Sequence, residues 1–528
     1  MIKLIYRISF ALMALMLSSC DFLDVKLQGA TTEESYYQNT DQLQEALNGV
    51  YATLGENSLY ASDMLGRMGL SADLGYEYYK KDANTVGYYQ ASTGDTRILG
   101  YWSACYRGIS RANMLLENLD RADGAQREKN RIKGEALFLR GYYYYMLVKR
   151  FGRIPVVLTT IDDINASEKF VPQSEVAEVY EQIIRDLTEA ADLVYTTDDV
   201  TEGWQVTQTT CWAMLARVCL NMAGYPANRP EMYAVAAQWA QQVIESGRHM
   251  LNPSYEQIFI NYAQDVFDIK ESLFEVNFWG DNEGVYKTAG MVGRNIGIES
   301  DTDSPIGFCE GMLRVNPYFY YLYEEGDLRR DWTISAFQYD GAGNKKMDAS
   351  PDAGGIISRK YCAKFRREYE ISTSKNASYT AINFPILRYS DVLLTYAECY
   401  AFDPSSADET LAYEYLNQVR RRGYGLPVET PDPTVDIAVT DSETLKQIIM
   451  DERAREFGYE MLRKDDLTRW GKLYEQMIYA GKFIEGRSTQ YQLAALMAYE
   501  SVRQRDELWP IPAREISVNP YLDQNTGW

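Results

Sequence analysis

The fold of this 528-residue chain is decided by the stretch LKQIIMDERAREFGYEMLRKDDLTRWGK, residues 445–472. Apolar residues recur in it at spacings of three and four, which is typical of amphipathic helices. The members of this pattern are Leu445, Ile448, Ile449, Phe457, Tyr459, Met461, Leu462, Leu467 and Trp470. Because Gly458 interrupts the pattern, we predict two helices that meet near this glycine.

Charged residues cluster in the middle of this stretch, at Asp451, Glu452, Arg453, Arg455 and Glu456. Asp451 precedes Arg455 by four residues, the spacing at which opposite charges on one helix face interact. On the pattern alone, the cluster is interpreted as a solvent-exposed face of ion pairs.

The chain ends in a second distinctive stretch, LWPIPAREISVNPYLDQNTGW, residues 508–528. The block ERAREFGYEMLRKDDLTRWG, followed in order by PIP, NP and QNTGW, resembles the C-terminal signature of the SusD/RagB family of bacterial outer-membrane nutrient-binding lipoproteins. Earlier blocks resemble the same family: YRGISRAN, GEALFLRGYYYY with FGRIPVV, and LRYSDVLLTYAECYAF with LNQVRRRG. The resemblance covers nearly the whole mature chain and is strongest at its two ends.

The N-terminus is predicted to be a lipoprotein signal peptide, residues 1–19. Lys3 and Arg7 precede an apolar run from Ile8 to Leu17, and the sequence LSSC follows. A transmembrane anchor is the alternative, but the run is about half of the ~20 apolar residues that a membrane-spanning helix needs.

Cys20 is the predicted site of lipid attachment, because Leu17-Ser18-Ser19-Cys20 resembles a lipobox. Ser19 stands where glycine or alanine is more common. Two or more acyl chains on one cysteine hold a soluble domain to a bilayer durably. Asp21 and Asp24 follow closely, and in the family acidic residues here favour display on the cell exterior.

The charge of the chain argues against nucleic acid as a partner. The net charge is −22 and becomes −24 when Lys3 and Arg7 leave with the signal peptide. Such a chain binds nucleic acids and anionic lipid faces poorly. The six cysteines after Cys20 have no CxxC spacing, so we predict that they are buried free thiols. A disulfide between two of them is the alternative.

The length favours either two subdomains or a stacked-repeat architecture, because it exceeds what one hydrophobic core usually serves. Helical periodicity predicts a helix after an N-cap at Asp41, and then paired helices. The predicted helical segments are 102–119 with 132–150, 176–195 with 209–222, 232–246, and 393–400 with 411–422. Their spacing is compatible with tetratricopeptide-like units of ~34 residues.

The family resemblance implies that these hairpins stack into a scaffold and that an irregular subdomain packs against it. We therefore expect a mainly α fold with a helical N-terminal region, residues 20–225, and a C-terminal region, residues 252–528. In the latter, residues 252–386 are expected to be rich in loops and residues 387–528 helical. Short strands are predicted near 273–278 and 382–387.

The sequence nominates no catalytic or metal site and no cofactor motif. His249 is the only histidine, which excludes histidine triads and clustered-histidine metal sites. Its position after Ser246-Gly247-Arg248 predicts a role at a helix end. The 75 Asp and Glu residues leave a glycosidase-type carboxylate pair as an open alternative, but no motif points to one.

The sequence feature that points to a function is the abundance of tyrosine. Tyrosine (43) outnumbers phenylalanine (17) and tryptophan (9) together. Tyrosine and tryptophan rings offer a flat apolar face to a sugar while their polar edges stay hydrated. Two loop clusters are therefore the candidate ligand sites, with packing of the loops as an equal alternative: Tyr76, Tyr78, Tyr79, Asn84, Tyr88 and Tyr89, and then Trp279, Asp281, Asn282 and Tyr286.

The resemblance implies a binding protein without catalytic activity, lipid-anchored in the outer membrane and facing the cell exterior. Such a protein captures an oligosaccharide and passes it to a SusC-like TonB-dependent transporter. A peptide-binding subunit of the same kind of complex is the leading alternative, because RagB-type relatives bind peptides. A structural subunit without a ligand and a glycoside hydrolase come after it.

Overall fold

The structure is a computed structural model that describes residues 36–78, 86–160, 170–279, 289–347, 357–371, 375, 377–487 and 489–528. The predicted signal peptide and Cys20 lie outside these residues. Among the residues described, no helix combines the length and the apolar character that crossing a bilayer requires.

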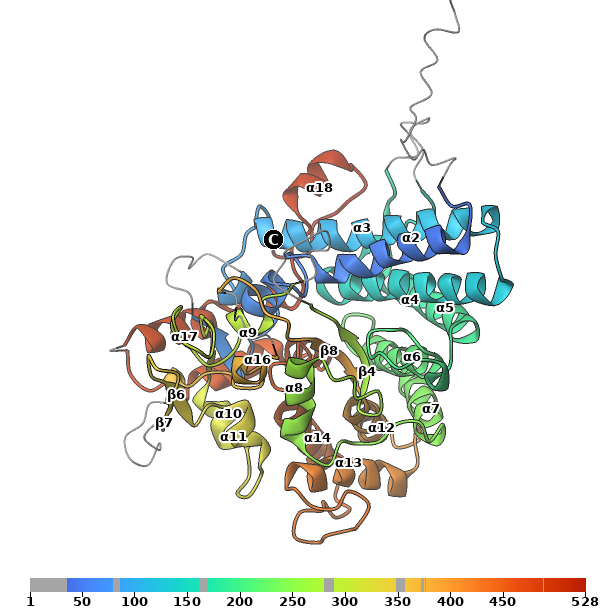
Figure 1. The fold of residues 1–528 in the computed structure, drawn as a ribbon. Helices are drawn as coiled ribbons and strands as arrows, with labels where there is room; N and C mark the ends of the chain where they lie inside the picture. The colour runs from blue at the N-terminus through green and yellow to red at the C-terminus, as the bar shows by residue number, and fades with distance from the viewer. Residues whose placement is uncertain are drawn as a thin grey trace, which may run out of the picture.

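Antiparallel helices form the scaffold of the molecule, as the periodicity predicts. Neighbours in space pack along a continuous series in which α7 is followed by α12, although a long stretch of chain separates them. Figure 1 shows this series running from the blue helices α2 and α3 to the orange α13. The helices are α2 (Thr40–Ala52), α3 (Thr96–Asn118), α4 (Gln126–Phe151), α5 (Val176–Leu193), α6 (Gln208–Ala223), α7 (Met232–Glu245), α12 (Tyr389–Phe402), α13 (Glu409–Gly423) and α14 (Ser442–Phe457).

The first two helices begin earlier than the sequence predicts. The N-cap of α2 is Asn39, whose side chain accepts a hydrogen bond from the Gln42 amide, so the prediction of Asp41 as the cap is wrong. The α3 helix begins at Thr96, six residues before Trp102, because the Asp95 carboxylate accepts from the amides of Arg97 and Ile98.

The second layer contains strand β1 (Gly75–Glu77), the short elements between α7 and α12, and the last helices of the chain. The predicted strands form one antiparallel pair, β4 (Ser272–Val276) with β8 (Phe384–Arg388). Helix α8 (Tyr255–Gln264) was not expected in this region; the Ser254 hydroxyl caps it by accepting from the Gln257 amide. The others are β1 (Gly75–Glu77), α9 (Val292–Asn295), β5 (Leu313–Val315), α10 (Pro317–Leu322), α11 (Arg329–Thr333), β6 (Phe337–Tyr339), β7 (Lys345–Met347), α15 (Arg463–Arg469), α16 (Leu473–Gly481), α17 (Gln490–Ser501) and α18 (Ala513–Val518).

The predicted pair of helices around Gly458 is present as α14 and α15, but the charged cluster on α14 is buried. Glu452, Arg453, Arg455 and Glu456 are each at most 6% exposed. The interpretation as a solvent-exposed face is therefore wrong. Arg455 pairs with Glu452 at 3.0 Å, while Asp451 accepts a hydrogen bond from Gln447.

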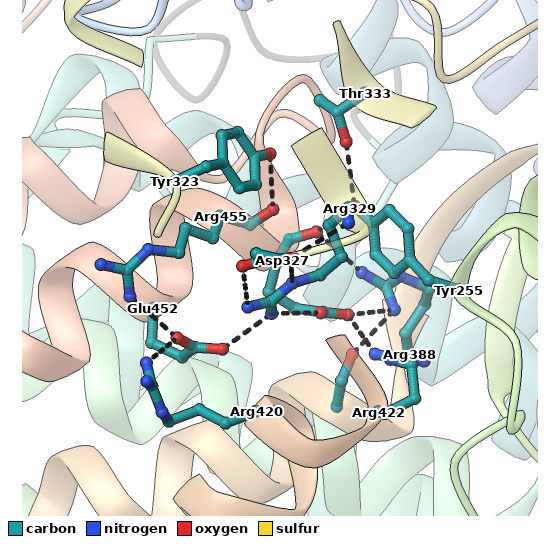
Figure 2. A network of polar contacts seen from close by, with 12 residues as sticks. Tyr255, Tyr323, Asp327, Arg329, Thr333, Arg388, Arg420, Arg422, Glu452 and Arg455 are labelled. Carbon is teal, nitrogen blue, oxygen red and sulfur yellow. Dashed lines mark hydrogen bonds and ion pairs between the residues drawn. The ribbon is translucent and has the colours of Figure 1, made fainter. Parts of the chain in front are cut away.

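Glu452 and Glu456 are the centre of a buried ionic network. Figure 2 shows Glu452 of this network together with Arg329, Arg388, Arg420 and Arg422. Glu456 pairs with Arg329 of α11 at 3.1 Å, with Arg388 at the end of β8 at 2.8 Å, and with Arg422 of α13 at 2.5 Å. Glu452 pairs with Arg329 at 2.7 Å and with Arg420 of α13 at 3.2 Å. One turn of α14 thus joins the scaffold helix α13 to two elements of the second layer, α11 and β8.

A second set of buried ion pairs continues this network through the scaffold. Arg453 of α14 pairs with Asp391 of α12 at 2.9 Å and with Asp466 of α15 at 2.8 Å. Asp391 also pairs with Arg217 of α6 at 2.7 Å. Burial by itself raises the pKa of Asp391, but Arg217 and Arg453 outweigh it and lower that pKa to about 2.

We expect Glu456→Gln to lower the free energy of unfolding by about 3–5 kcal/mol, because it leaves three buried arginines without their shared anion. The matched control is Glu443→Gln on the same helix, whose side chain is 83% exposed and pairs with Lys446. That change should cost less than about 1 kcal/mol. Urea unfolding measures both, and equal effects would contradict the assignment of the network.

Asp391 also predicts a pH dependence. Its folded pKa of about 2 lies below its ordinary 3.8, so its contribution to stability is present above about pH 4 and is lost as the pH falls toward 2. Between pH 4 and pH 2, the free energy of unfolding should therefore fall by about 2 kcal/mol less in Asp391→Asn than in the unaltered protein. Urea unfolding at pH 2, 3, 4 and 5 tests this, and parallel profiles for both proteins would refute it.

Candidate functional site

Strand β1 places the first predicted aromatic cluster in the second layer. It pairs antiparallel with β5, with Tyr76 opposite Arg314. Two residues of the C-terminal signature hold the chain just before the strand. Arg463 pairs with Asp73 at 2.6 Å, and the Tyr459 hydroxyl donates to the Leu74 carbonyl at 3.1 Å.

Three tyrosines of this cluster are buried. Tyr76, Tyr88 and Tyr89 are at most 4% exposed. The Tyr76 hydroxyl donates to the Ser358 carbonyl at 2.7 Å, and the Tyr89 hydroxyl donates to the Ser71 carbonyl at 2.8 Å. These rings pack the second layer rather than face solvent, so we do not retain them as ligand contacts.

Tyr78 is the member of this cluster whose ring lies at the surface. It is partly exposed and its hydroxyl donates to the Gln490 side chain at 3.1 Å. Its ring lies 4.6 Å from that of Tyr491 on α17, measured between centroids, with an angle of 34° between the planes. The other two predicted residues of this loop, Tyr79 and Asn84, lie outside the described residues.

The second predicted cluster is represented by one described residue. Trp279 follows β4, and 57% of its surface is exposed. Asp281, Asn282 and Tyr286 lie outside the residues that the structure describes, so Trp279 is the part of this cluster that is placed.

A cavity of about 350 Å³ opens beside the Tyr78 and Tyr491 rings, which we call the Tyr78–Tyr491 pocket. Its volume is within the range of small-molecule sites. The lining combines aromatic rings with carboxylates and one arginine: Tyr78, Glu299, Ser300, Asp301, Phe308, Cys309, Glu310, Met312, Arg314 and Tyr491.

Arg314 organises this pocket. Its guanidinium carbon lies 5.3 Å from the centroid of the Tyr78 ring, 5.0 Å from that of Tyr491 and 3.8 Å from that of Tyr361. The same guanidinium donates to Glu299 at 2.9 Å. The arginine therefore contacts all three rings and orients the Glu299 carboxylate.

Glu299 also accepts a hydrogen bond from the Tyr361 hydroxyl at 2.6 Å. Burial is the main cause of a raised pKa for Tyr361, so this phenol remains protonated and donates to Glu299. Since the Glu299 side chain is 50% exposed, it combines fixed orientation with access to solvent. Glu310, which also lines the pocket, pairs with Arg294 at 2.5 Å.

This arrangement suits a neutral, hydroxyl-rich ligand. Two rings present apolar faces, and oriented carboxylates and arginines provide acceptors and donors beside them. Sequence reasoning missed Tyr491, Arg314 and Glu299, because they come from distant parts of the chain and Tyr491 lies in the first turn of a helix. The cross-strand position of Arg314 gave no sequence signal.

The histidine and the cysteines that the structure describes have structural roles. His249 is buried: its Nε2 lies 2.8 Å from the Thr209 hydroxyl, and its Nδ1 lies 3.1 Å from the Ile269 carbonyl. Burial lowers the pKa of His249 to about 4, so the ring is neutral at pH 7 and ties α6 to the approach to β4 rather than capping a helix. The six described cysteines are buried free thiols, as predicted.

No group of three or more His, Cys, Asp or Glu side chains suitable for a metal ion occurs among the residues with described positions.

Comparisons with known proteins agree with this fold. Residues 320–528 match the SusD family, and residues 21–220 match a family described as "Starch-binding associating with outer membrane". The chain is 26% identical to SusD-like protein P2 of Formosa agariphila over 474 residues, which covers 88% of this chain and 90% of the relative. It is 22% identical to the starch-binding protein SusD of Bacteroides thetaiotaomicron over 452 residues, covering 78% of this chain and 75% of the relative.

Among solved structures, a SusD homologue from Bacteroides thetaiotaomicron superposes with a TM-score of 0.84. It is 26% identical in sequence, and the superposition covers 94% of this chain and 98% of the homologue. The stacked helical hairpins, the buried C-terminal signature and these matches lead to one conclusion: the chain belongs to the SusD/RagB family.

Proposed function

We propose that this protein is a lipid-anchored subunit of the outer membrane that binds an oligosaccharide at the Tyr78–Tyr491 pocket. The observation that carries the proposal is the pair of rings held by Arg314 beside an oriented Glu299. A family match described as starch-binding and a relative named as a starch-binding protein support the ligand class.

The proposed mechanism is capture and release without bond cleavage. The Tyr78 and Tyr491 rings stack on the apolar faces of sugar rings, and Glu299 and Asp301 accept hydrogen bonds from hydroxyl groups. Trp279, Asp281, Asn282, Tyr286, Tyr79 and Asn84 remain proposed ligand contacts. The bound oligosaccharide then passes to a SusC-like TonB-dependent transporter.

The anchor and the location are part of the proposal. Acyl chains on Cys20 hold the mature chain to the outer membrane, with the binding layer toward the cell exterior. The sequence LSSC after a charged and apolar leader supports this anchor.

We expect Tyr491→Ala to weaken oligosaccharide binding at least tenfold, because it removes one of the two adjacent rings of the pocket. Tyr491→Phe keeps the ring face and should bind within about threefold of the unaltered protein. The control is Tyr474→Ala on α16, a tyrosine that is 39% exposed and does not line the pocket. Titration calorimetry on residues 21–528, with a panel that includes maltotetraose and laminaritetraose, measures these affinities.

The other candidate functions have distinct outcomes in the same assay. Binding of peptides but of no oligosaccharide would replace the ligand class. Release of shortened sugars during incubation would identify a hydrolase. Absence of any binding, with the transporter still retained in a pull-down, would indicate a structural subunit.

A further inference from the structure

A second cavity lies between the end of α2, the chain around Trp204 and the end of β4. Its volume is about 340 Å³. It shares no lining residue with the Tyr78–Tyr491 pocket. The residues around it are Asn48, Tyr51, Ala52, Leu54, Gly55, Trp204, Glu275, Val276, Asn277 and Phe278, and we call it the Tyr51–Trp204 pocket.

Two partly exposed aromatic rings form its walls. The centroids of Tyr51 and Trp204 lie 5.6 Å apart, with the ring planes at 87°. The Tyr51 hydroxyl donates to the buried Glu135 at 2.7 Å and accepts from the Val206 amide at 3.3 Å. Tyr51 is therefore fixed before a ligand arrives, which lowers the entropy that binding must overcome.

The floor is apolar and the rim is polar. Leu54 and Phe278 are at most 2% exposed and close the bottom of the pocket. The amides of Asn48, which is exposed, and Asn277, which is partly exposed, stand at the rim. The Asn277 amide is oriented, because its nitrogen donates to Asp265 at 3.0 Å.

The one carboxylate of the lining is also held in place. Glu275 is buried and accepts hydrogen bonds from the Ser272 hydroxyl at 2.6 Å and the Asn383 amide at 3.0 Å. Burial is the main reason that the pKa of Glu275 rises to about 7, so this carboxyl takes up a proton more readily than an exposed one. The pocket thus lacks the strong fixed charge that would select an ionic ligand.

We propose that the Tyr51–Trp204 pocket is a second carbohydrate site that takes one or two sugar residues. Aromatic walls with amides at the rim match the apolar faces and hydroxyl edges of a pyranose ring. The inference rests on the proposed function, since it assigns the same ligand class to a separate place on the chain. Two sites on one chain raise the avidity for a long polysaccharide without new contacts at either site.

The test is calorimetric titration of residues 21–528 with maltotetraose and laminaritetraose. We expect two equivalents to bind the unaltered protein and one equivalent to bind Trp204→Ala. Ala52→Leu blocks the pocket mouth without removing a packed ring, and it should also bind one equivalent. Trp239→Ala removes a partly buried tryptophan of α7 away from the pocket and should keep two.

Tyr491→Ala distinguishes failure of this inference from failure of the proposed function. One residual equivalent in Tyr491→Ala, abolished by adding Ala52→Leu, supports two independent sites. A single equivalent that Tyr491→Ala abolishes and Ala52→Leu retains overturns the second site and leaves the proposed function intact. A single equivalent that Ala52→Leu abolishes and Tyr491→Ala retains overturns the Tyr78–Tyr491 pocket as the binding site instead. If the unaltered protein binds neither sugar, both proposed sites are overturned.

Discussion

The structure depends on carboxylates of α14 that lie out of water and are neutralised by arginines from three other elements, β8, α11 and α13. A buried carboxylate is unfavourable unless it is paired and hydrogen-bonded, and Glu456 meets this condition through Arg329, Arg388 and Arg422. Such pairs add little net stability compared with apolar packing, but each fixes a geometry, because removing one partner leaves a buried charge. The network therefore fixes the geometry in which the two layers join, and it adds little to the net stability of that junction.

The same helix pair holds the candidate binding pocket in place. Lys364 donates to the Glu456 carbonyl at 2.9 Å and pairs with Glu460, and this brings Tyr361 against Arg314. Arg463 and Tyr459 hold the residues before β1, and the Asn316 amide donates to the Ala480 carbonyl at 3.1 Å after β5. Strand β5, which carries Arg314, and strand β1, which precedes Tyr78, are thus both attached to the C-terminal region.

Sequence periodicity was sufficient for the scaffold, because amphipathic helices repeat their apolar residues along a local stretch of chain. The pairs α3–α4, α5–α6 and α12–α13 and the strands β4 and β8 lie close to their predicted positions. Helix ends were less predictable, since Asn39 and Asp95 act as caps through local hydrogen bonds that apolar spacing does not report.

The binding residues were only partly predictable because burial and long-range pairing decide them. Tyr76 and Tyr78 stand two residues apart, yet Tyr76 is buried and Tyr78 lies at the surface beside Tyr491. The charged cluster of α14 was misinterpreted for the same reason: its partners, Arg329, Arg388 and Arg422, are far away in the sequence. Residue type indicated the kind of ligand, but the fold decides which residues reach the surface where a ligand binds.

The central claim is that the ionic network makes the scaffold and the pocket-bearing layer one cooperative unit. Native-state hydrogen exchange tests it directly, by comparing the amides of α14 with those of β5 and of Tyr361 and Cys362. The account predicts opening free energies that agree within about 1 kcal/mol across these segments. Exchange of β5 at several kcal/mol lower free energy, while α14 stays protected, would contradict it.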